Sequence, residues 1–235
     1  MLRLAVARIP EPAAAGGDAA PGWMGAAERQ RWIVLAAAAR REFAASRALL
    51  RGLLRAVTGI ADGAWDVSAE PGTAPRARAL EGDIAMDAMH VSISHRLGWV
   101  AAAVSATPVG IDIECERPAR SDAGERAALM LSPGEMAAWH ALAPADRASA
   151  LLTRWTAKEA WFKASPPESP PWDFRRIAAQ ACAPAHANVR TWSALPLHVA
   201  LYCADARALA AAECDGLPGT ANTSFWQVRH AVPAN

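Results

Sequence analysis

Three apolar runs separated by very short gaps constrain the fold of this chain more than any other feature of its sequence. They are HVSISH at 90–95, GWVAAAV at 98–104 and PVGIDIE at 108–114. Gaps of two or three residues leave no room for a crossover connection, so consecutive strands must run antiparallel. The sequence therefore predicts an antiparallel meander over 90–114.

Helical patterns flank this meander on both sides. Residues 25–57 are rich in Ala, Leu and Arg with apolar residues at near-helical spacing, which predicts two consecutive helices. Residues 121–164 predict two or three more helices, of which 147–164 is the longest. In this region Ser132 and Glu135 form a capping-box pattern.

The remaining segments give weaker signals. Leu2, Leu4 and Val6 alternate with other residues as in a first strand, LPLHVALYC at 195–203 is strand-like, and 206–213 is helix-like. The Gly- and Pro-containing stretch 62–88 predicts an irregular connection, SPPESPP at 165–171 predicts an exposed loop, and 215–235 gives no clear pattern.

Composition limits the environment and the partners. The formal charge is +1, from 24 Lys and Arg against 23 Asp and Glu, which argues against a nucleic-acid surface spread over the whole protein. No apolar run approaches the roughly 20 residues of a membrane helix. The four cysteines lack CxxC spacing, as is typical of a reducing compartment. We therefore expect a cytoplasmic protein, without nucleic-acid or membrane partners and monomeric.

Two carboxylates share one face of the strand at 108–114. Strand alternation places Asp112 and Glu114 on the face that also carries Gly110, roughly 7 Å apart. That spacing suits one hard cation such as magnesium, and the glycine would let a ligand come close. The alternative is a solvated polar face, which is the more common meaning of such a pair.

Glu159 lies within the helix predicted at 147–164. At about 100° per residue, Glu159 falls within about 40° of Trp155 and about 60° of Phe162, and so faces inward beside the apolar stripe. An inward carboxylate requires a cation or donors, and a metal shared with the strand carboxylates would supply one. A salt bridge to Lys163, one turn further on, is the alternative.

Several basic and polar side chains could complete an anion site. Lys158 and Lys163 flank Glu159 and suit a pyrophosphate, although single helix lysines are usually only solvated. Ser94 and His95 end a strand just before a tight turn, where both could reach an anion. Arginines in the second predicted helix, Arg40, Arg41, Arg47 and Arg51, offer guanidinium groups for a terminal phosphate.

With these residues in place, the sequence resembles the surfactin-synthetase-activating type of 4'-phosphopantetheinyl transferase. The two core motifs of that family, approximately (V/I)GxDxE and (F/W)xxKExxxK, match VGIDIE at 109–114 and WTAKEAWFK at 155–163. SISHRLGWVAAAV, SRALLRGLL and LSPGEMAAW also look like family segments. The resemblance covers roughly residues 25–203.

The resemblance implies a role for each matching residue. Asp112, Glu114 and Glu159 would hold Mg²⁺. Glu159, with Glu135 as second choice, would be the general base, and Lys163 would assist catalysis. Residues that would bind coenzyme A are Arg47, Arg41, Ser94, His95, Lys158 and Lys163.

Two departures from the family pattern bear on the phosphate site. Family members often carry Gly-Lys-Pro where this chain has Thr73-Ala74-Pro75, so a lysine is missing and Arg76 is a candidate substitute. Arg96 also stands where the family more often has a small residue. It could add a phosphate contact or narrow the entrance.

The family fold implied by the resemblance is α+β, a pseudo-dimer of two similar lobes. Each lobe is an antiparallel three-stranded sheet packed against a long helix, with coenzyme A in the cleft between them. We expect lobes at 1–106 and 107–235, with both motifs in the second lobe and 205–235 unassigned.

The implied activity is that of a holo-carrier-protein synthase. The enzyme would transfer the 4'-phosphopantetheine arm of coenzyme A to a serine of an apo acyl or peptidyl carrier protein and release 3',5'-ADP. The carrier would serve fatty acid, polyketide or nonribosomal peptide synthesis. One alternative is a degenerate relative that binds coenzyme A or a carrier protein without catalysis. Another is a magnesium-dependent nucleotide hydrolase, although the chain lacks a P-loop.

Overall fold

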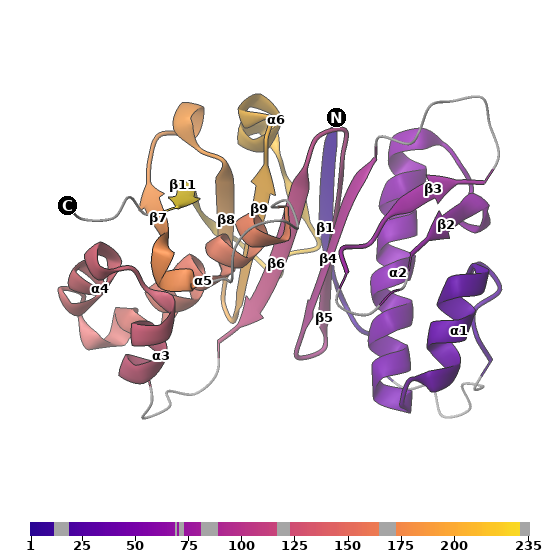
Figure 1. The fold of residues 1–235 in the computed structure, drawn as a ribbon, viewed down its shortest axis with the longest axis horizontal. Coiled ribbons are helices and arrows are strands. Elements are labelled where there is room, and N and C mark those ends of the chain that lie inside the picture. The colour runs from indigo at the N-terminus through magenta and orange to yellow at the C-terminus, as the bar shows by residue number, and fades with distance from the viewer. Residues whose placement is uncertain are drawn as a thin grey trace.

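The computed structural model describes residues 1–11, 19–68, 70, 73–80, 89–116, 123–164 and 173–230, which form an α+β fold with two main sheets (Figure 1). The predicted loop at 165–171 lies outside the described residues, as do parts of the predicted connection at 62–88. The α+β class expected from the sequence is confirmed.

The first sheet has the strand order β10-β1-β5-β4. Its strands are β1 (Leu2–Arg8), β4 (His90–Arg96), β5 (Trp99–Ser105) and the short β10 (Cys214–Asp215). Strand β5 runs antiparallel to both β1 and β4, as the short gap at 96–98 predicts. Helices α1 (Ala26–Val34) and α2 (Ala37–Thr58) and the hairpin of β2 (Trp65–Val67) and β3 (Ala77–Ala79) belong to this half of the molecule.

Helix α2 covers one face of this sheet because its apolar residues recur at helical spacing. Leu50 and Leu54 pack in one buried cluster with Ala102 and Val104 of β5. The helix ends at Gly59, whose positive φ of 75° is the left-handed conformation that favours glycine at a helix C-terminus. Two consecutive helices were predicted here, and the structure confirms them.

The second sheet has the order β6-β9-β8-β11-β7. Its strands are β6 (Val109–Cys115), β7 (Ile177–Ala181), β8 (Val189–Ala194), β9 (Leu197–Cys203) and β11 (Asn222–His230). The helices of this half are α3 (Ala123–Met130), α4 (Pro133–His140), α5 (Arg147–Lys163) and α6 (Ala206–Ala211). Short 3₁₀ turns occupy Asp62–Ala64, Pro144–Asp146, Phe174–Arg176 and Pro184–His186.

Strand β6 does not complete the predicted three-stranded meander. It leaves β5, joins the second sheet and pairs antiparallel with β9, with Ile111 opposite Leu201. It still runs beside β4, where the hydroxyl of Ser92 accepts a hydrogen bond from the Ile111 N–H at 3.0 Å. The reason is that β6 is buried on both faces: Ile111 and Ile113 enter the central core while Gly110 and Asp112 are also buried.

Glycine at position 110 allows helix α5 to approach β6 closely. A Cβ atom at this position would lie 2.0 Å from the carbonyl oxygen of Ala160. The buried face of α5 carries small residues such as Ala157 and Ala160, whereas Trp155 and Phe162 are only partly buried. Gly110 therefore admits the helix backbone, where the sequence suggested an approaching ligand.

The two halves share one core and exchange chain. Leu4 and Ala101 of the first sheet lie in the same buried cluster as Ile111 and Leu201 of the second. The tail also returns to the first half, since β10 pairs in parallel with β1. Within the described residues, no helix is both long and apolar enough to cross a membrane.

Candidate active site

Strands β4 and β6 and helix α5 bring three predicted site residues together. The Lys163 ammonium lies 2.6 Å from Asp112 Oδ1 and 3.0 Å from Ser94 Oγ, and it also donates to the Ile111 carbonyl at 3.2 Å. The Ser94 hydroxyl donates to the same Asp112 oxygen at 2.8 Å. Lys163 thus uses three donors on three protein acceptors, and residues from positions 94, 112 and 163 form one polar cluster.

Glu114 is held by groups from two other elements. Arg96 Nε at the end of β4 lies 2.9 Å from Glu114 Oε2, and the Trp155 side chain hydrogen-bonds to the same carboxylate. The pKa of Glu114 is raised, chiefly by burial, while Arg96 acts in the opposite direction and Asp112 adds to the rise. The strand alternation that predicted a neighbouring Asp112 and Glu114 pair therefore agrees with the structure.

Glu159 on α5 lies in the field of both strand carboxylates. Its pKa is raised from an ordinary 4.5 to about 7. Burial is the largest cause, the charge of Asp112 adds to it, Lys163 opposes it, and Glu114 also contributes to the rise. A carboxyl group with a pKa near neutrality, next to two more carboxylates, can exchange a proton under physiological conditions.

The fit of this cluster to a cation rests on its oxygen atoms. Among the described residues, Asp112 Oδ2 is buried without a hydrogen-bond partner, and the charge of Asp112 raises the pKa of both Glu114 and Glu159. Such hard oxygen donors are what Mg²⁺ prefers. As the side chains lie, however, no three His, Cys, Asp or Glu residues of the described part form a metal-binding group. Lys163 and Arg96 instead provide the positive charge beside Asp112 and Glu114.

Lys158 and Glu135 lie together in a second, buried location. The Lys158 side chain is 0% exposed and donates to Glu135 Oε2 at 2.6 Å and to two backbone carbonyls, those of Met130 and Phe174. Glu135 also accepts from the N–H groups of Ser132 and Ala179, at 2.7 and 2.9 Å. Burial lowers the pKa of Lys158, although Glu135 opposes this. This placement does not support a coenzyme A contact for Lys158 or a catalytic role for Glu135.

The reason for this separation is the phase of α5. Lys158 precedes Glu159 by one residue, which is about 100° around the helix. Lys158 therefore points toward α4 and the Phe174 turn, whereas Glu159 and Lys163 are on the side of β6. The sequence placed both lysines beside one anion, and the structure brings only Lys163 to the carboxylates.

A hollow of about 370 Å³ beside α2 is lined by two of the residues predicted to bind coenzyme A, Arg47 and His95. Arg31, Phe43, Arg47, Thr73, Pro75 and His95 are among its lining residues. Arg47 is only 9% exposed, and its Nη1 is buried without a hydrogen-bond partner. Burial lowers the pKa of Arg47, while Glu28, 4.0 Å away, opposes this. An orphaned guanidinium nitrogen in a hollow is suited to an anion.

The other arginines and the histidine differ in their surroundings. His95 lines the same hollow, and its Nδ1 is 3.5 Å from Glu42 Oε2. Arg51 is fully buried in a two-point ion pair with Glu28, so it is structural. Arg41 and Arg76 are exposed, and the backbone N–H of Arg76 donates to Ser68 Oγ.

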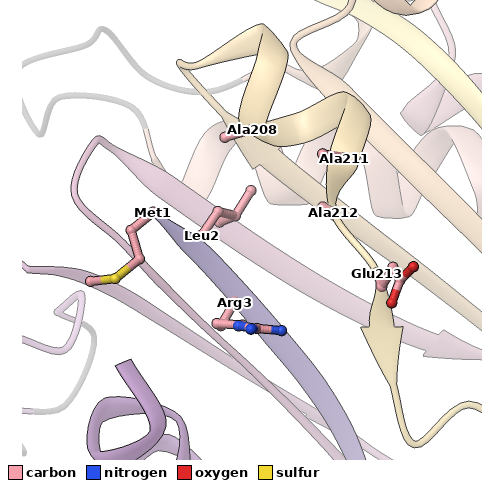
Figure 2. Close-up of a pocket in the computed structure, with 7 residues that line it drawn as sticks. All are labelled: Met1, Leu2, Arg3, Ala208, Ala211, Ala212 and Glu213. Atoms are coloured by element: carbon pink, nitrogen blue, oxygen red, sulfur yellow. The ribbon is translucent and has the colours of Figure 1, made fainter. Parts of the chain in front are cut away.

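A second hollow, of about 460 Å³, lies elsewhere, between the start of β1 and α6. It is lined by Met1, Leu2, Arg3, Ala208, Ala211, Ala212 and Glu213. Figure 2 shows Leu2 pointing into this gap toward Ala211 and Ala212. None of the predicted site residues lines it.

Two residues near the cluster were not predicted from the sequence. Trp155 was read as part of an apolar stripe, but its side chain hydrogen-bonds Glu114. His198 of β9 lies opposite Glu114 and is 1% exposed, and its ring nitrogens contact Glu116 Oε1 at 3.0 Å and the Thr153 and Ser193 hydroxyls at 3.1 Å. A histidine inside the apolar run LPLHVALYC was the available signal, since a buried polar side chain requires partners.

Comparison with known proteins supports the resemblance in the part of the chain that carries both motifs. Residues 108–211 match the model of the 4'-phosphopantetheinyl transferase superfamily. A 4'-phosphopantetheinyl transferase of Bacillus subtilis is 34% identical over 79 residues, which is 34% of this chain and 34% of that protein. The matched stretch thus spans about a third of the length of this relative. The predicted resemblance is confirmed, and residues 108–211 are similar to the 4'-phosphopantetheinyl transferase superfamily.

Proposed function

We propose that this protein transfers the 4'-phosphopantetheine arm of coenzyme A to a serine of an apo acyl or peptidyl carrier protein, with release of 3',5'-ADP. The observation that carries the proposal is the polar cluster at β4, β6 and α5, in which Ser94, Asp112 and Lys163 are in mutual contact. It contains residues of both motifs, and two of its three elements, β6 and α5, lie within the region that matches the superfamily.

Magnesium would be held by Asp112, Glu114 and Glu159. The unpartnered, buried Asp112 Oδ2 and the raised pKa of Glu159 support this assignment, because the first is an unsatisfied oxygen and the second reflects repulsion from neighbouring carboxylates. When bound, the ion would neutralise this charge and withdraw electron density from the pyrophosphate of coenzyme A. Removal of magnesium should then abolish transfer.

Glu159 would act as the general base. The carrier serine oxygen attacks the β-phosphorus of coenzyme A, a new P–O bond forms, and the bond to the bridging oxygen breaks so that 3',5'-ADP leaves with that electron pair. The serine proton would pass to Glu159, directly or through water, because this inward carboxylate of α5 lies beside the two strand carboxylates. Lys163 would stabilise the charge that develops on the phosphate oxygens.

Coenzyme A would extend from this cluster into the hollow beside α2. His95 links the two places, since it follows Ser94 in β4 and lines the hollow together with Arg47. The buried, unpartnered Nη1 of Arg47 supports a contact with an anionic group of the nucleotide. Arg41 and Arg76 would contribute only at the exposed rim.

We also propose a domain division, an oligomeric state and a cellular location for the protein. Residues 1–106 and 107–235 would be the two lobes of a pseudo-dimer, supported by a long helix on each sheet, α2 on the first and α5 on the second. We further propose a monomeric protein of the cytoplasm, with acyl or peptidyl carrier domains as its macromolecular partners.

The test is a transfer assay with intact-mass detection. The protein is incubated with coenzyme A, Mg²⁺ and a panel of apo acyl and peptidyl carriers, and each carrier is examined for the mass of the added arm. Lys163→Ala and Arg207→Ala serve as the site variant and the exposed control. Calorimetric binding of coenzyme A without any mass gain would favour a non-catalytic binding protein, and ADP release without a carrier would favour a hydrolase.

A further inference from the structure

Arg96 is the one arginine of β4, and it is placed against a predicted metal ligand. Its Nε lies 2.9 Å from Glu114 Oε2, yet this nitrogen has no hydrogen-bond partner, so its N–H is not directed at that oxygen. The Arg96 side chain is 39% exposed and that of Glu114 is 15% exposed. The contact is therefore an ion pair without a hydrogen bond, made by a buried nitrogen of a side chain that is otherwise partly exposed.

The buried pair of Arg51 and Glu28 shows what a permanent arginine pair is like in this protein. There two guanidinium nitrogens donate to both carboxylate oxygens, and both side chains are 0% exposed. Such two-point geometry is the strong form of this interaction. The Arg96 pair lacks it, since a single contact without a hydrogen bond joins Glu114 to an arginine that is 39% exposed. Arg96 is therefore held less firmly than Arg51.

The other cations near the carboxylates are less available. Lys163 places its donors on Ser94, Ile111 and Asp112, and Lys158 is fully buried against Glu135. At the position of the missing lysine the chain has Ala74. Among the described residues, Arg96 is thus the cationic side chain of this cluster that is most exposed and that makes no hydrogen bond to its carboxylate.

We propose that Arg96 is a built-in counter-ion that occupies Glu114 while the cation site is empty, is displaced when a divalent cation binds, and then serves the pyrophosphate of coenzyme A. The inference rests on the proposed function for its ligands. Two positive groups, Arg96 and Lys163, lie against two of the three carboxylates, Asp112, Glu114 and Glu159. A divalent cation that takes the place of Arg96 compensates the negative charge of these carboxylates. The Arg96 guanidinium is then free to bind a phosphate.

Removal of Arg96 should change two affinities in opposite directions. Without Arg96, a divalent cation meets no competitor for Glu114, so its affinity for the free protein should rise. Without Arg96, the pyrophosphate loses one cationic contact, so coenzyme A should bind more weakly once the cation site is filled. An arginine that only stabilises the fold would produce neither change, and one that only binds phosphate would produce the second alone.

The test measures cation binding in the absence of coenzyme A. Mn²⁺ is titrated into the full chain and followed by water-proton relaxation, with Mg²⁺ added in competition. Relative to the unchanged protein, Arg96→Ala should bind Mn²⁺ on the order of fivefold more tightly, because no arginine then competes with the cation for Glu114. Arg96→Gln, which keeps much of the side-chain length, should behave in the same way if truncation to alanine disturbs folding.

The matched control is Arg55→Ala. This change removes an ion pair between Arg55 of α2 and Asp62, and it should leave the Mn²⁺ affinity unchanged. Coenzyme A is then titrated calorimetrically at saturating Mg²⁺, where Arg96→Ala should bind coenzyme A about tenfold more weakly.

Equal or weaker Mn²⁺ affinity in both Arg96 variants would overturn the inference. No Mn²⁺ binding by any form would overturn both this inference and the proposed metal site. The predicted shifts without transfer to any carrier would retain the inference and reject the proposed activity.

Discussion

At the scale of single residues, Glu159 links the stability of the protein to pH. Its pKa of about 7 exceeds the ordinary 4.5, so the native state holds a proton that the unfolded state releases. Between these two values the native state binds more protons, and stability must fall as pH rises through this window. The shift corresponds to a loss on the order of 2–3 kcal/mol above pH 7.

The corresponding variant is Glu159→Gln, examined in EDTA. Its free energy of unfolding should match that of the unchanged protein near pH 4.5 and exceed it by on the order of 2 kcal/mol at pH 8, because the amide carries no charge to bury. Urea unfolding across this pH range provides the measurement. A stability difference that is independent of pH would show that the pKa of Glu159 is not raised in the native state.

Lys158 and Lys163 should separate in the same two assays. Lys158→Met leaves Glu135 as an uncompensated buried charge and should lower the free energy of unfolding by about 3–5 kcal/mol. Lys163→Met removes the ion pair of Asp112 at a partly exposed site, so it should lose less stability than Lys158→Met while its transfer activity falls by on the order of 100-fold. A stable Lys158→Met protein that no longer transfers the arm would return Lys158 to the active site.

The sequence predicted which residues belong to this cluster better than it predicted which of them contact one another. Period-two alternation correctly paired Asp112 with Glu114, because a strand allows only two side-chain directions. It could not show that Lys163 lies on Asp112 or Arg96 on Glu114, since both contacts join elements far apart in sequence. The same is true of Lys158, whose direction depends on where α4 packs.

At the scale of elements, the contact between β6 and α5 positions the carboxylates. Asp112 and Glu114 reach Glu159 only because the helix backbone comes close to the strand at Gly110, where a Cβ atom would lie 2.0 Å from the Ala160 carbonyl oxygen. That atom belongs to the backbone and cannot rotate away. Either the helix or the strand must move to admit a side chain.

Gly110→Ala should therefore be strongly destabilising, by about 3 kcal/mol or more, or prevent folding. Gly52→Ala is the matched control, since a Cβ atom there meets nothing within 4 Å and alanine favours a helix interior. This control should gain roughly 0.5–1 kcal/mol. Thermal unfolding of both variants measures this difference in stability. Equal stabilities of the two variants would refute the prediction.

Local patterns predicted most of the helices but not all of the strands. The capping box at Ser132 and Glu135 forms as predicted, and α1, α2, α5 and α6 lie within or near their predicted ranges. Strands β7, β8 and β11 were not predicted. Strand β11 lies in a tail whose buried residues, Trp226 and Val228, are two positions apart among polar neighbours, which is too short a pattern to distinguish from a loop.

At the scale of the whole molecule, both sheets stabilise one another. Residues of β1 and β5 share a buried cluster with residues of β6, β8 and β9, and β10 ties the tail to β1. Such a shared core predicts one cooperative unfolding transition for the full chain. Calorimetry should give a calorimetric enthalpy equal to the van't Hoff enthalpy, and two resolved transitions would indicate lobes that fold independently.

This arrangement could not be read from the sequence, because short gaps predict which strands are antiparallel but not which sheet each joins. The run at 108–114 followed two neighbouring strands and was expected to pair with them, yet β6 pairs with β9 some 90 residues later. Long-range pairing depends on complementary faces of distant segments, and the resemblance supplied the two-lobed outline that local patterns lacked.

We propose that the cluster of Ser94, Asp112, Glu114, Glu159 and Lys163 transfers the arm of coenzyme A. The decisive experiment is intact-mass spectrometry of an apo carrier panel, with coenzyme A and Mg²⁺ and with or without EDTA. At least one carrier serine should gain the mass of the arm, and both EDTA and Lys163→Met should abolish this gain. Coenzyme A binding without any mass gain across acyl and peptidyl carriers would contradict this proposal.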